Sequence, residues 1–132
     1  MTTAGLLTLR ARLEPTRATL VAPGAQQRDP IRRPARVAQM LALAHRIERE
    51  IASGVVADRG EAAARLGLTA PRVSQLCDLL VLAPDIQEQI LFLESVDGVE
   101  PLTERALRPL TKEPRWDVQR GFFARCRRSP RR

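Results

Sequence analysis

Two short runs of apolar residues at helical spacing occupy the middle of the chain, and a glycine separates them. In the first run, residues 59–66, three consecutive alanines and Leu66 favour helix. In the second run, Val73, Leu76 and Leu80 recur every three or four residues and give a helix one apolar face. Gly67 lies between them, where a chain leaving a helix commonly needs a positive φ. The pattern predicts two amphipathic helices joined by a tight turn.

Residues with capping chemistry stand at the start of both helices. Asp58 and Glu61 have capping-box spacing, in which Asp58 accepts from the Glu61 N–H and Glu61 reaches back to the Asp58 N–H. Thr69 is expected to cap the second helix, and Pro71 lies in its first turn, where a missing N–H costs nothing. These signals place the second helix at residues 69–82.

The spacing of the inward positions is that of a helix-turn-helix, whose two helices cross closely. A close crossing needs a small residue on the first helix, glycine at the turn and apolar residues at set offsets in the second. Those places are filled, in order, by Ala63, Gly67, Leu68, Val73 and Leu76. The alternative is an ordinary helical hairpin in a small bundle. All five residues in register, together with the caps, favour the helix-turn-helix.

Further helices are expected on both sides of this pair. Pro34 is a suitable first helical residue, Thr103 a suitable cap, and Pro109 is expected to end the helix that Thr103 begins. Asp97-Gly98 predicts a turn. The expected helices cover residues 34–54, 83–95, 103–108 and 114–126. The fold class predicted is all-α, a small domain of five to six helices with a central helix-turn-helix and basic flexible termini.

The two ends of the chain differ in composition from the middle. Residues 1–33 are rich in Pro, Thr, Ala and Arg, and we expect a disordered basic arm that ends in a linker over residues 28–34. Residues 6–13 alternate leucine or alanine with polar residues, a weak strand signal that lacks a partner unless residues 19–21 pair back. The predicted domain spans residues 34–124, and residues 125–132 form a basic tail.

The net charge of +7 is concentrated in these ends. Residues 1–36 carry seven arginines against two acids, and residues 115–132 carry seven arginines against one acid. Residues 37–114 hold twelve acids against eight bases. Basic terminal arms commonly bind nucleic acid, although solubility and an arginine-rich genome would give the same composition.

Composition also argues against several classes of protein. No apolar run approaches the ~20 residues of a membrane-spanning helix, and the first residues lack the basic-then-apolar order of a signal peptide. Cys77 and Cys126 show no metal-binding spacing, which favours a reduced, cytoplasmic protein. There is no phosphate loop, HExxH, GxSxG or triad candidate, and His45 is expected on a solvated surface. We therefore expect no enzyme, no cofactor, no metal and no small-molecule substrate.

The order of elements resembles the helix-turn-helix domain of the ParB/KorB partition proteins. In that family the recognition helix leads into a leucine-x-Pro-acid-x-Gln-Glu segment, and a leucine-Ser/Thr-x-x-x-Ala helix follows. The matching segments here are Leu82 to Glu88 and Leu102 to Ala106. The likeness covers residues 55–112. Residues 1–33 offer no counterpart of the family's nucleotide-binding domain, and the dimerisation domain has none either. The resemblance therefore implies a DNA-binding module, of a sort at home on phage and plasmid elements, without CTP hydrolysis or clamp sliding.

The hypothesis that follows is sequence-specific binding of double-stranded DNA, with the second helix of the motif in the major groove. Gln75 would pair with adenine, and Ser74 with a base or a phosphate. The expected base-contacting residues are Thr69, Ala70, Pro71, Arg72, Ser74, Gln75 and Asp78, and the expected phosphate-contacting residues are Arg32, Arg33, Arg36, Arg125, Arg127 and Arg128. Other partners considered are a second copy in a homodimer and a recombinase-type protein. The rival function is a helical protein-interaction module that serves a recombinase or polymerase as accessory subunit.

Overall fold

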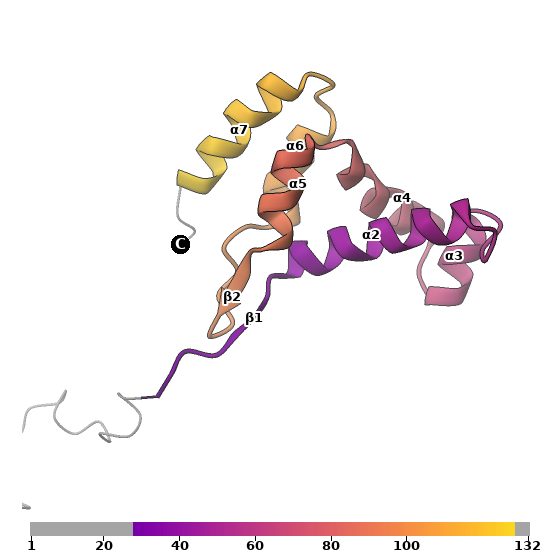
Figure 1. Cartoon of the computed structure of the whole chain (residues 1–132), viewed down its shortest axis with the longest axis horizontal. Helices are drawn as coiled ribbons and strands as arrows, with labels where there is room; N and C mark the ends of the chain where they lie inside the picture. Colours follow the sequence, from indigo (N-terminus) through magenta and orange to yellow (C-terminus); the bar gives the residue numbers. More distant parts are fainter. Residues whose placement is uncertain (1–27, 129–132) are drawn as a thin grey trace, which may run out of the picture. The chain divides into compact units, whose positions relative to one another are not determined.

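The computed structural model describes residues 28–128, which fold mainly into α-helices (Figure 1). The chain divides into two units, residues 1–30 and 31–132. Of the first unit only Arg28, Asp29 and Pro30 are described, and they belong to no helix or strand. The elements of the second unit are β1 (Arg32–Pro34), α2 (Arg36–Ala52), α3 (Arg59–Leu66), α4 (Ala70–Asp78), a 3₁₀ turn (Leu79–Val81), α5 (Pro84–Leu91), β2 (Glu94–Val96), α6 (Glu104–Thr111) and α7 (Trp116–Arg128). This confirms the all-α class, with six α-helices in the described residues.

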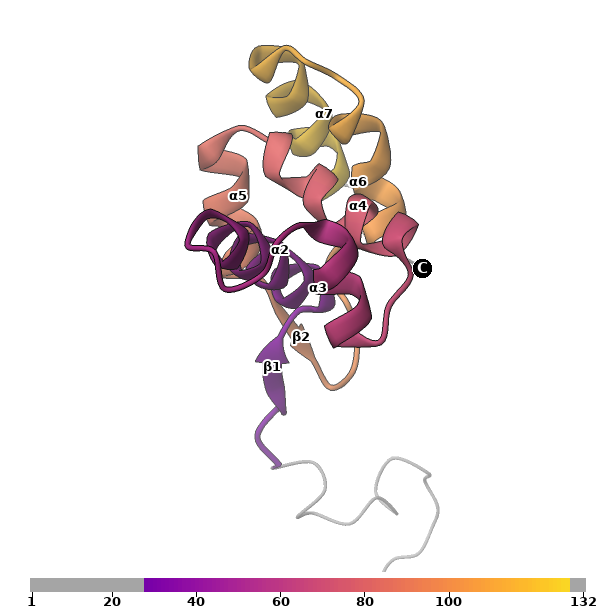
Figure 2. The ribbon, with the colours of Figure 1, turned by 90° about the vertical axis from the view of Figure 1, so that its right-hand side faces the viewer.

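Helix α2 is the element against which most of the others pack. Figure 2 views it nearly end-on, with α5 on one side and the α3–α4 pair on the other. Its apolar stripe is buried as the spacing predicted, and consists of Val37, Ala38, Met40, Leu41, Ala44 and Ile47. Helices α6 and α7 pack against each other beside this layer.

The turn between α3 and α4 follows from its sequence. The Asp58 carboxylate accepts from the Glu61 N–H at 2.8 Å, as expected. Glu61 reaches back one residue further than a strict capping box requires, to the Ala57 N–H at 2.7 Å. Gly67 has φ +70°, and the Leu68 N–H bonds the Ala63 carbonyl at 2.9 Å, which is the Schellman ending of a helix. The Thr69 hydroxyl then caps α4 by accepting from the Arg72 N–H.

Two clusters of buried side chains form the core. The larger cluster joins α2 to α5, α6 and α7, and it contains Leu76 of α4. The smaller cluster lies under the helix-turn-helix and consists of Ile47, Val56, Ala62, Ala63, Val73 and Cys77. Leu43, Leu68 and Leu80 are partly buried and pack against both clusters. The two motif helices therefore cross over small side chains, as the helix-turn-helix pattern predicted.

A two-stranded antiparallel sheet was not predicted, and it corrects the expected linker. Arg32 pairs with Val96, Arg33 with Ser95 and Pro34 with Glu94. Pro34 is therefore a strand residue, and α2 begins at Arg36 instead. A residue before proline prefers extended backbone, which suits Arg33 to a strand. Its partner strand lies about sixty residues away, beyond the reach of local pattern.

The same sheet shortens the helix that was expected over residues 83–95. Helix α5 ends at Leu91, and the chain turns back at Asp97 and Gly98, with φ +51° and +82°. The predicted turn is present, and Val96 and Val99 exchange backbone hydrogen bonds across it, which makes it the tip of a hairpin.

Three helix ends also differ from expectation. Helix α4 ends at Asp78, and the residues that follow tighten into the 3₁₀ turn instead of continuing to 82. Pro109 lies inside α6, which runs on to Thr111 because the buried Leu107 and Leu110 hold its last turn against the core. Helix α7 continues to Arg128, so the start of the expected basic tail is helical.

One buried polar side chain joins three segments. Gln119 of α7 is fully buried, and its Oε1 accepts from the Ala83 N–H at 2.8 Å. Its Nε2 donates to the Glu113 carbonyl at 2.7 Å and, at 3.3 and 3.4 Å, to the carbonyls of Val81 and Leu110. Each of these backbone groups lies at the end of an element, where helical partners run out. Gln119 therefore closes the junction of α5, α6 and α7.

The strand suggested for residues 6–13 lies outside the described residues. Among the helices of residues 28–128, none has the length and apolar character needed to cross a bilayer.

Candidate nucleic-acid interface

The outer face of α4 carries most of the side chains predicted to contact bases. Thr69, Ala70, Pro71, Ser74 and Gln75 are exposed, whereas Val73 and Leu76 are buried beneath them. Arg72 and Asp78 are half-buried. The helix therefore presents a short polar and small-residue surface at its N-terminal end, the part that enters the major groove in helix-turn-helix proteins.

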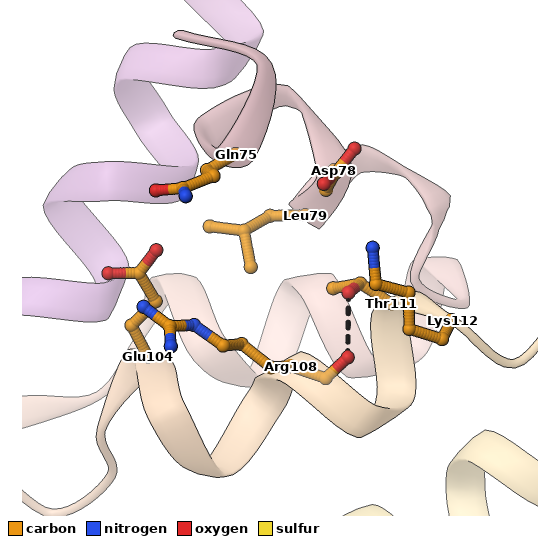
Figure 3. A pocket seen from close by; sticks show the side chains of 7 residues that line it. All are labelled: Gln75, Asp78, Leu79, Glu104, Arg108, Thr111 and Lys112. Atoms are coloured by element: carbon orange, nitrogen blue, oxygen red, sulfur yellow. Dashed lines mark hydrogen bonds between the residues drawn. The ribbon is translucent and has the colours of Figure 1, made fainter. Parts of the chain in front are cut away.

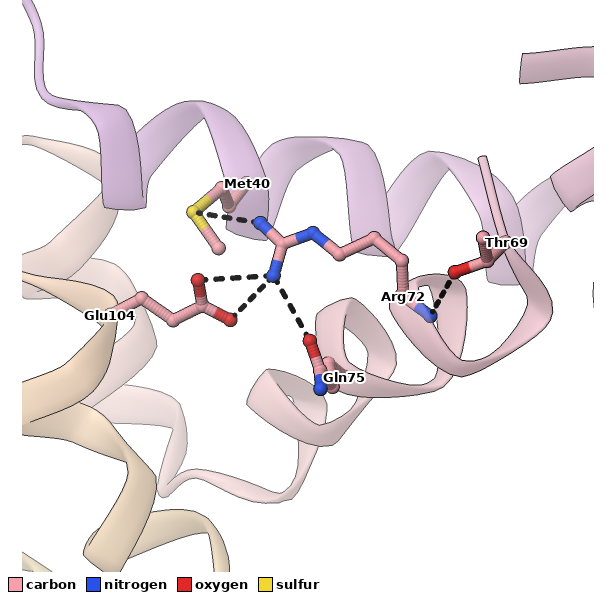
Figure 4. Close-up of polar contacts among 5 residues, drawn as sticks. All are labelled: Met40, Thr69, Arg72, Gln75 and Glu104. Atoms are coloured by element: carbon pink, nitrogen blue, oxygen red, sulfur yellow. Dashed lines mark hydrogen bonds and ion pairs between the residues drawn. The ribbon is translucent and has the colours of Figure 1, made fainter. Parts of the chain in front are cut away.

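Arg72 is turned back toward the body of the domain, as Figure 4 shows. Its Nη1 lies 2.8 and 3.1 Å from the two carboxylate oxygens of Glu104 on α6. The same nitrogen donates to Oε1 of Gln75 at 3.2 Å, and Nη2 lies 3.9 Å from the Met40 sulfur. A residue predicted to contact DNA thus ties α4 to α2 and α6.

A groove runs between α4 and α6 (Figure 3). Gln75, Asp78 and Leu79 line one wall, and Arg108, Thr111 and Lys112 line the other, with Glu104 at one end. The Thr111 hydroxyl donates to the Arg108 carbonyl at 2.8 Å, so the side of the groove formed by α6 is fixed by its own last turn.

A second hollow adjoins this groove and shares Glu104 and Arg108 with it. Its floor includes Met40 and Leu102, and its rim includes Arg36 and Arg105. Taken together, the two depressions are lined by five cationic side chains (Arg36, Arg72, Arg105, Arg108 and Lys112) and three carboxylates (Asp78, Glu100 and Glu104). The surface next to α4 is therefore positive on balance, although the domain's middle segment is acidic.

Arg105, Arg108 and Lys112 were not among the predicted site residues. They stand at i, i+3 and i+7 and are all exposed; Arg105 and Arg108 belong to α6, and Lys112 is its C-cap. That spacing was visible in the sequence, but only the packing of α6 beside α4 brings it to the motif.

The arginines predicted to contact phosphate occupy two separate places. Arg32 pairs with Glu94 across the sheet at 3.2 Å, and the backbone N–H of Arg36 donates to Glu100 at 2.8 Å. Arg33 is exposed between them on β1. The second group, Arg125, Arg127 and Arg128, is exposed on the last turns of α7. The Arg125 guanidinium lies over the Phe122 ring, 4.5 Å from its centroid, which favours a cation–π contact.

Ion pairs between helices hold this scaffold together. Glu48 of α2 accepts from Arg59 at the start of α3, and this hydrogen bond raises the pKa of the guanidinium above its ordinary value. Arg120 of α7 makes a bidentate pair with Asp85 in the first turn of α5, and its hydrogen bonds lower the pKa of that carboxyl. Both pairs are half-exposed, so they orient the helices more than they stabilise them.

The titratable residues of the described chain are spread apart. No three His, Cys, Asp or Glu side chains within residues 28–128 come together in a way that could hold a metal ion. His45 is exposed, and its Nε2 lies 2.7 Å from Oε1 of Gln87. Burial raises the pKa of the Cys77 thiol to about 11, and a hydrogen bond to Glu48 adds to this. At neutral pH that thiol is protonated and unreactive.

Comparisons with protein-family models, with curated proteins and with solved structures gave no match. The resemblance to the ParB/KorB helix-turn-helix domain, read from the segments Leu82 to Glu88 and Leu102 to Ala106, therefore stays a prediction.

Proposed function

We propose that this protein binds double-stranded DNA sequence-specifically, with α4 in the major groove. The observation that supports this most is the combination of an exposed polar face at the start of α4 with two adjoining grooves that together are lined by more cationic than acidic side chains. A recognition helix that carries few charges of its own needs phosphate contacts from neighbouring elements. Arg105 and Arg108 of α6, and Lys112 at its C-cap, line these grooves, where such contacts are useful.

In this proposal the two sets of residues have different tasks. Ser74 and Gln75 contact base edges, because they are exposed and polar on the outer face. The basic residues of α6 and the arginines at both ends of the domain bind phosphate, which sets register and affinity but carries no sequence information.

The biological setting follows from family-level likeness alone. It suggests a cytoplasmic regulator or accessory factor of a phage- or plasmid-type element, working at DNA as a monomer or homodimer.

The rival proposal is a protein-interaction module serving a recombinase or polymerase. Its support comes from large apolar side chains exposed near the β1–β2 sheet, with Phe92 78% and Val99 67% exposed. A negative or apolar surface around Arg72 and Gln75 would favour this rival, whereas the two depressions there mix apolar side chains with five cationic side chains and three carboxylates. We therefore place DNA binding first.

The test is selection from a randomised duplex library with the full-length protein, followed by affinity measurements at several salt concentrations. Neutralising Arg105, Arg108 and Lys112 with glutamine should weaken selected and random DNA alike. The log-affinity against log-salt slope should flatten by up to about 2.7, which is ~0.9 for each of three phosphates that the variant no longer neutralises. The same experiment applies separately to Arg32, Arg33 and Arg36, and to Arg125, Arg127 and Arg128.

The matched control is Arg46→Gln, which removes the charge of an exposed arginine that pairs with Glu50 on its own helix. It lies outside the grooves beside α4, so it should leave the slope nearly unchanged. A library in which no sequence is enriched, together with a salt slope near zero, would reject DNA binding and favour the rival.

A further inference from the structure

The orientation of the Gln75 side-chain amide is fixed by chemistry. The atom that faces Nη1 of Arg72, 3.2 Å away, must be the amide oxygen, because a guanidinium has donors and no acceptor. The amide nitrogen then points away from Arg72, as Figure 4 shows. No acceptor within the described part of the chain is bonded to this nitrogen, and Gln75 is exposed. Toward solvent, Gln75 therefore presents N–H donors.

Arg72 is itself held in place from two sides. The Glu104 carboxylate binds Nη1 through both oxygens, and the Met40 sulfur contacts Nη2. Nη1 carries two hydrogens, which suffice for the carboxylate and for Gln75. The Arg72 and Glu104 side chains are only 35% and 20% exposed, so water screens this pair less than it screens a surface pair. Rotating the Gln75 amide would break its bond to an arginine that cannot follow.

The orientation of the Gln75 amide matters for base recognition, because adenine and guanine present different hydrogen-bonding groups in the major groove. Pairing a glutamine with adenine needs both amide groups, the oxygen to accept from N6 and the nitrogen to donate to N7. Guanine offers two acceptors, N7 and O6, to a donor. The Arg72 bond uses one of the two lone pairs of the Gln75 oxygen and turns that oxygen toward Arg72. The amide nitrogen is the group left pointing away, so this orientation suits the acceptors of guanine better than the paired donor and acceptor of adenine.

We propose that Glu104, acting through Arg72, sets the specificity of Gln75 for guanine and against adenine. This inference rests on the proposed DNA binding and replaces the expectation that Gln75 pairs with adenine. Glu104 and Arg72 are positioning residues here, and Gln75 makes the contact.

The experiment is library selection with the parent protein, Gln75→Ala and Arg72→Met. Gln75→Ala identifies the base pair in question, since preference at that pair alone should be lost. The parent should favour guanine over adenine there, on the order of tenfold. Arg72→Met keeps much of the aliphatic stem and removes the donor, so the amide can rotate and the preference should move toward adenine. A purely structural role for Arg72 would weaken all sequences equally and move no preference.

The outcomes separate this inference from the function on which it rests. A parent that enriches a site with adenine at the Gln75 position, or an Arg72→Met profile identical to the parent's, overturns the inference and leaves DNA binding intact. A parent that enriches nothing overturns both. Should Arg72→Met fail to fold, comparing the parent with Gln75→Ala still tests the inference. Guanine at the base pair that Gln75→Ala identifies supports it, and adenine there overturns it.

Discussion

Replacing Gln119 by leucine should destabilise the domain strongly, although the two side chains are similar in size. The change leaves the Ala83 N–H without its partner in a fully buried position, which costs about 1–3 kcal/mol. The Glu113 carbonyl, bonded at 2.7 Å, loses its donor as well, for about 1 kcal/mol more. The longer contacts to Val81 and Leu110 add little. We expect a net loss of about 2–4 kcal/mol, a large part of the ~5–15 kcal/mol typical of a small domain.

Urea unfolding followed by circular dichroism, with Trp116 fluorescence as a second probe on the same helix, measures this loss. For a domain of this size the melting temperature should fall by roughly 10 °C or more. The matched control is Gln89→Leu, the same substitution at an exposed position of α5, which should change stability little. If Gln119→Leu unfolds at the parent's urea concentration, packing alone closes the junction and the bonding argument fails.

Gln119→Glu distinguishes hydrogen bonding from packing by its pH dependence. A carboxylate there would face three carbonyl oxygens, so the folded state favours the protonated acid, and its pKa is raised relative to the unfolded chain. The deficit relative to the parent should therefore be smallest below the unfolded carboxyl pKa of about 4.3, and should grow as the pH rises through the folded pKa. A deficit that does not vary with pH would contradict this.

Three further predictions concern the helix-turn-helix and its surroundings. Gly67→Ala should lower the free energy of unfolding by about 1 kcal/mol, because φ is +70° there although no atom blocks a methyl group. Gly121→Ala within α7 should instead raise it by about 0.5–1 kcal/mol, because alanine favours helix. Equal melting temperatures for the two variants would refute the reasoning. Ala63→Leu should overpack the helix crossing at about 1–3 kcal/mol, and a melt equal to the parent's would show that the crossing is loose. Cys77 should resist a thiol reagent at pH 8 until the domain unfolds, while the partly exposed Cys126 reacts first; two equally fast thiols would contradict the burial described.

Signals that act within a few residues made the central motif predictable. Asp58, Gly67 and Thr69 each bond or turn locally, and the structure bears out all three. The predicted cap of α6 is likewise present, because the Thr103 hydroxyl accepts from the Ala106 N–H at 3.2 Å.

The features that could not be predicted join residues far apart in the chain. The partner of Arg72 lies 32 residues away, and that of Gln119 Oε1 lies 36 residues away. Periodicity shows that a side chain faces inward but not what it meets there. The hairpin is an intermediate case. Asp97-Gly98 flanked by two valines is a strong local signal for its turn. The pairing of its first strand, β2, with the distant β1 could not be predicted from local sequence.

The candidate site was predicted in part for the same reason. The exposed face of α4 follows from the helical period, which turns Val73 and Leu76 inward. The contribution of α6 and the orientation of Gln75 do not follow from the helical period, because they depend on how α6 packs beside α4.

Helix α7 and the short sheet have a consequence for the entropy of the proposed DNA binding. Charges on a flexible arm must be ordered when they meet a partner, and each residue fixed costs about 1–2 kcal/mol of backbone entropy. Arg32, Arg33 and Arg36, and likewise Arg125, Arg127 and Arg128, stand on backbone that is already ordered by strand pairing or helix. Because folding has already ordered this backbone, these arginines would lose only side-chain entropy on binding an anionic surface.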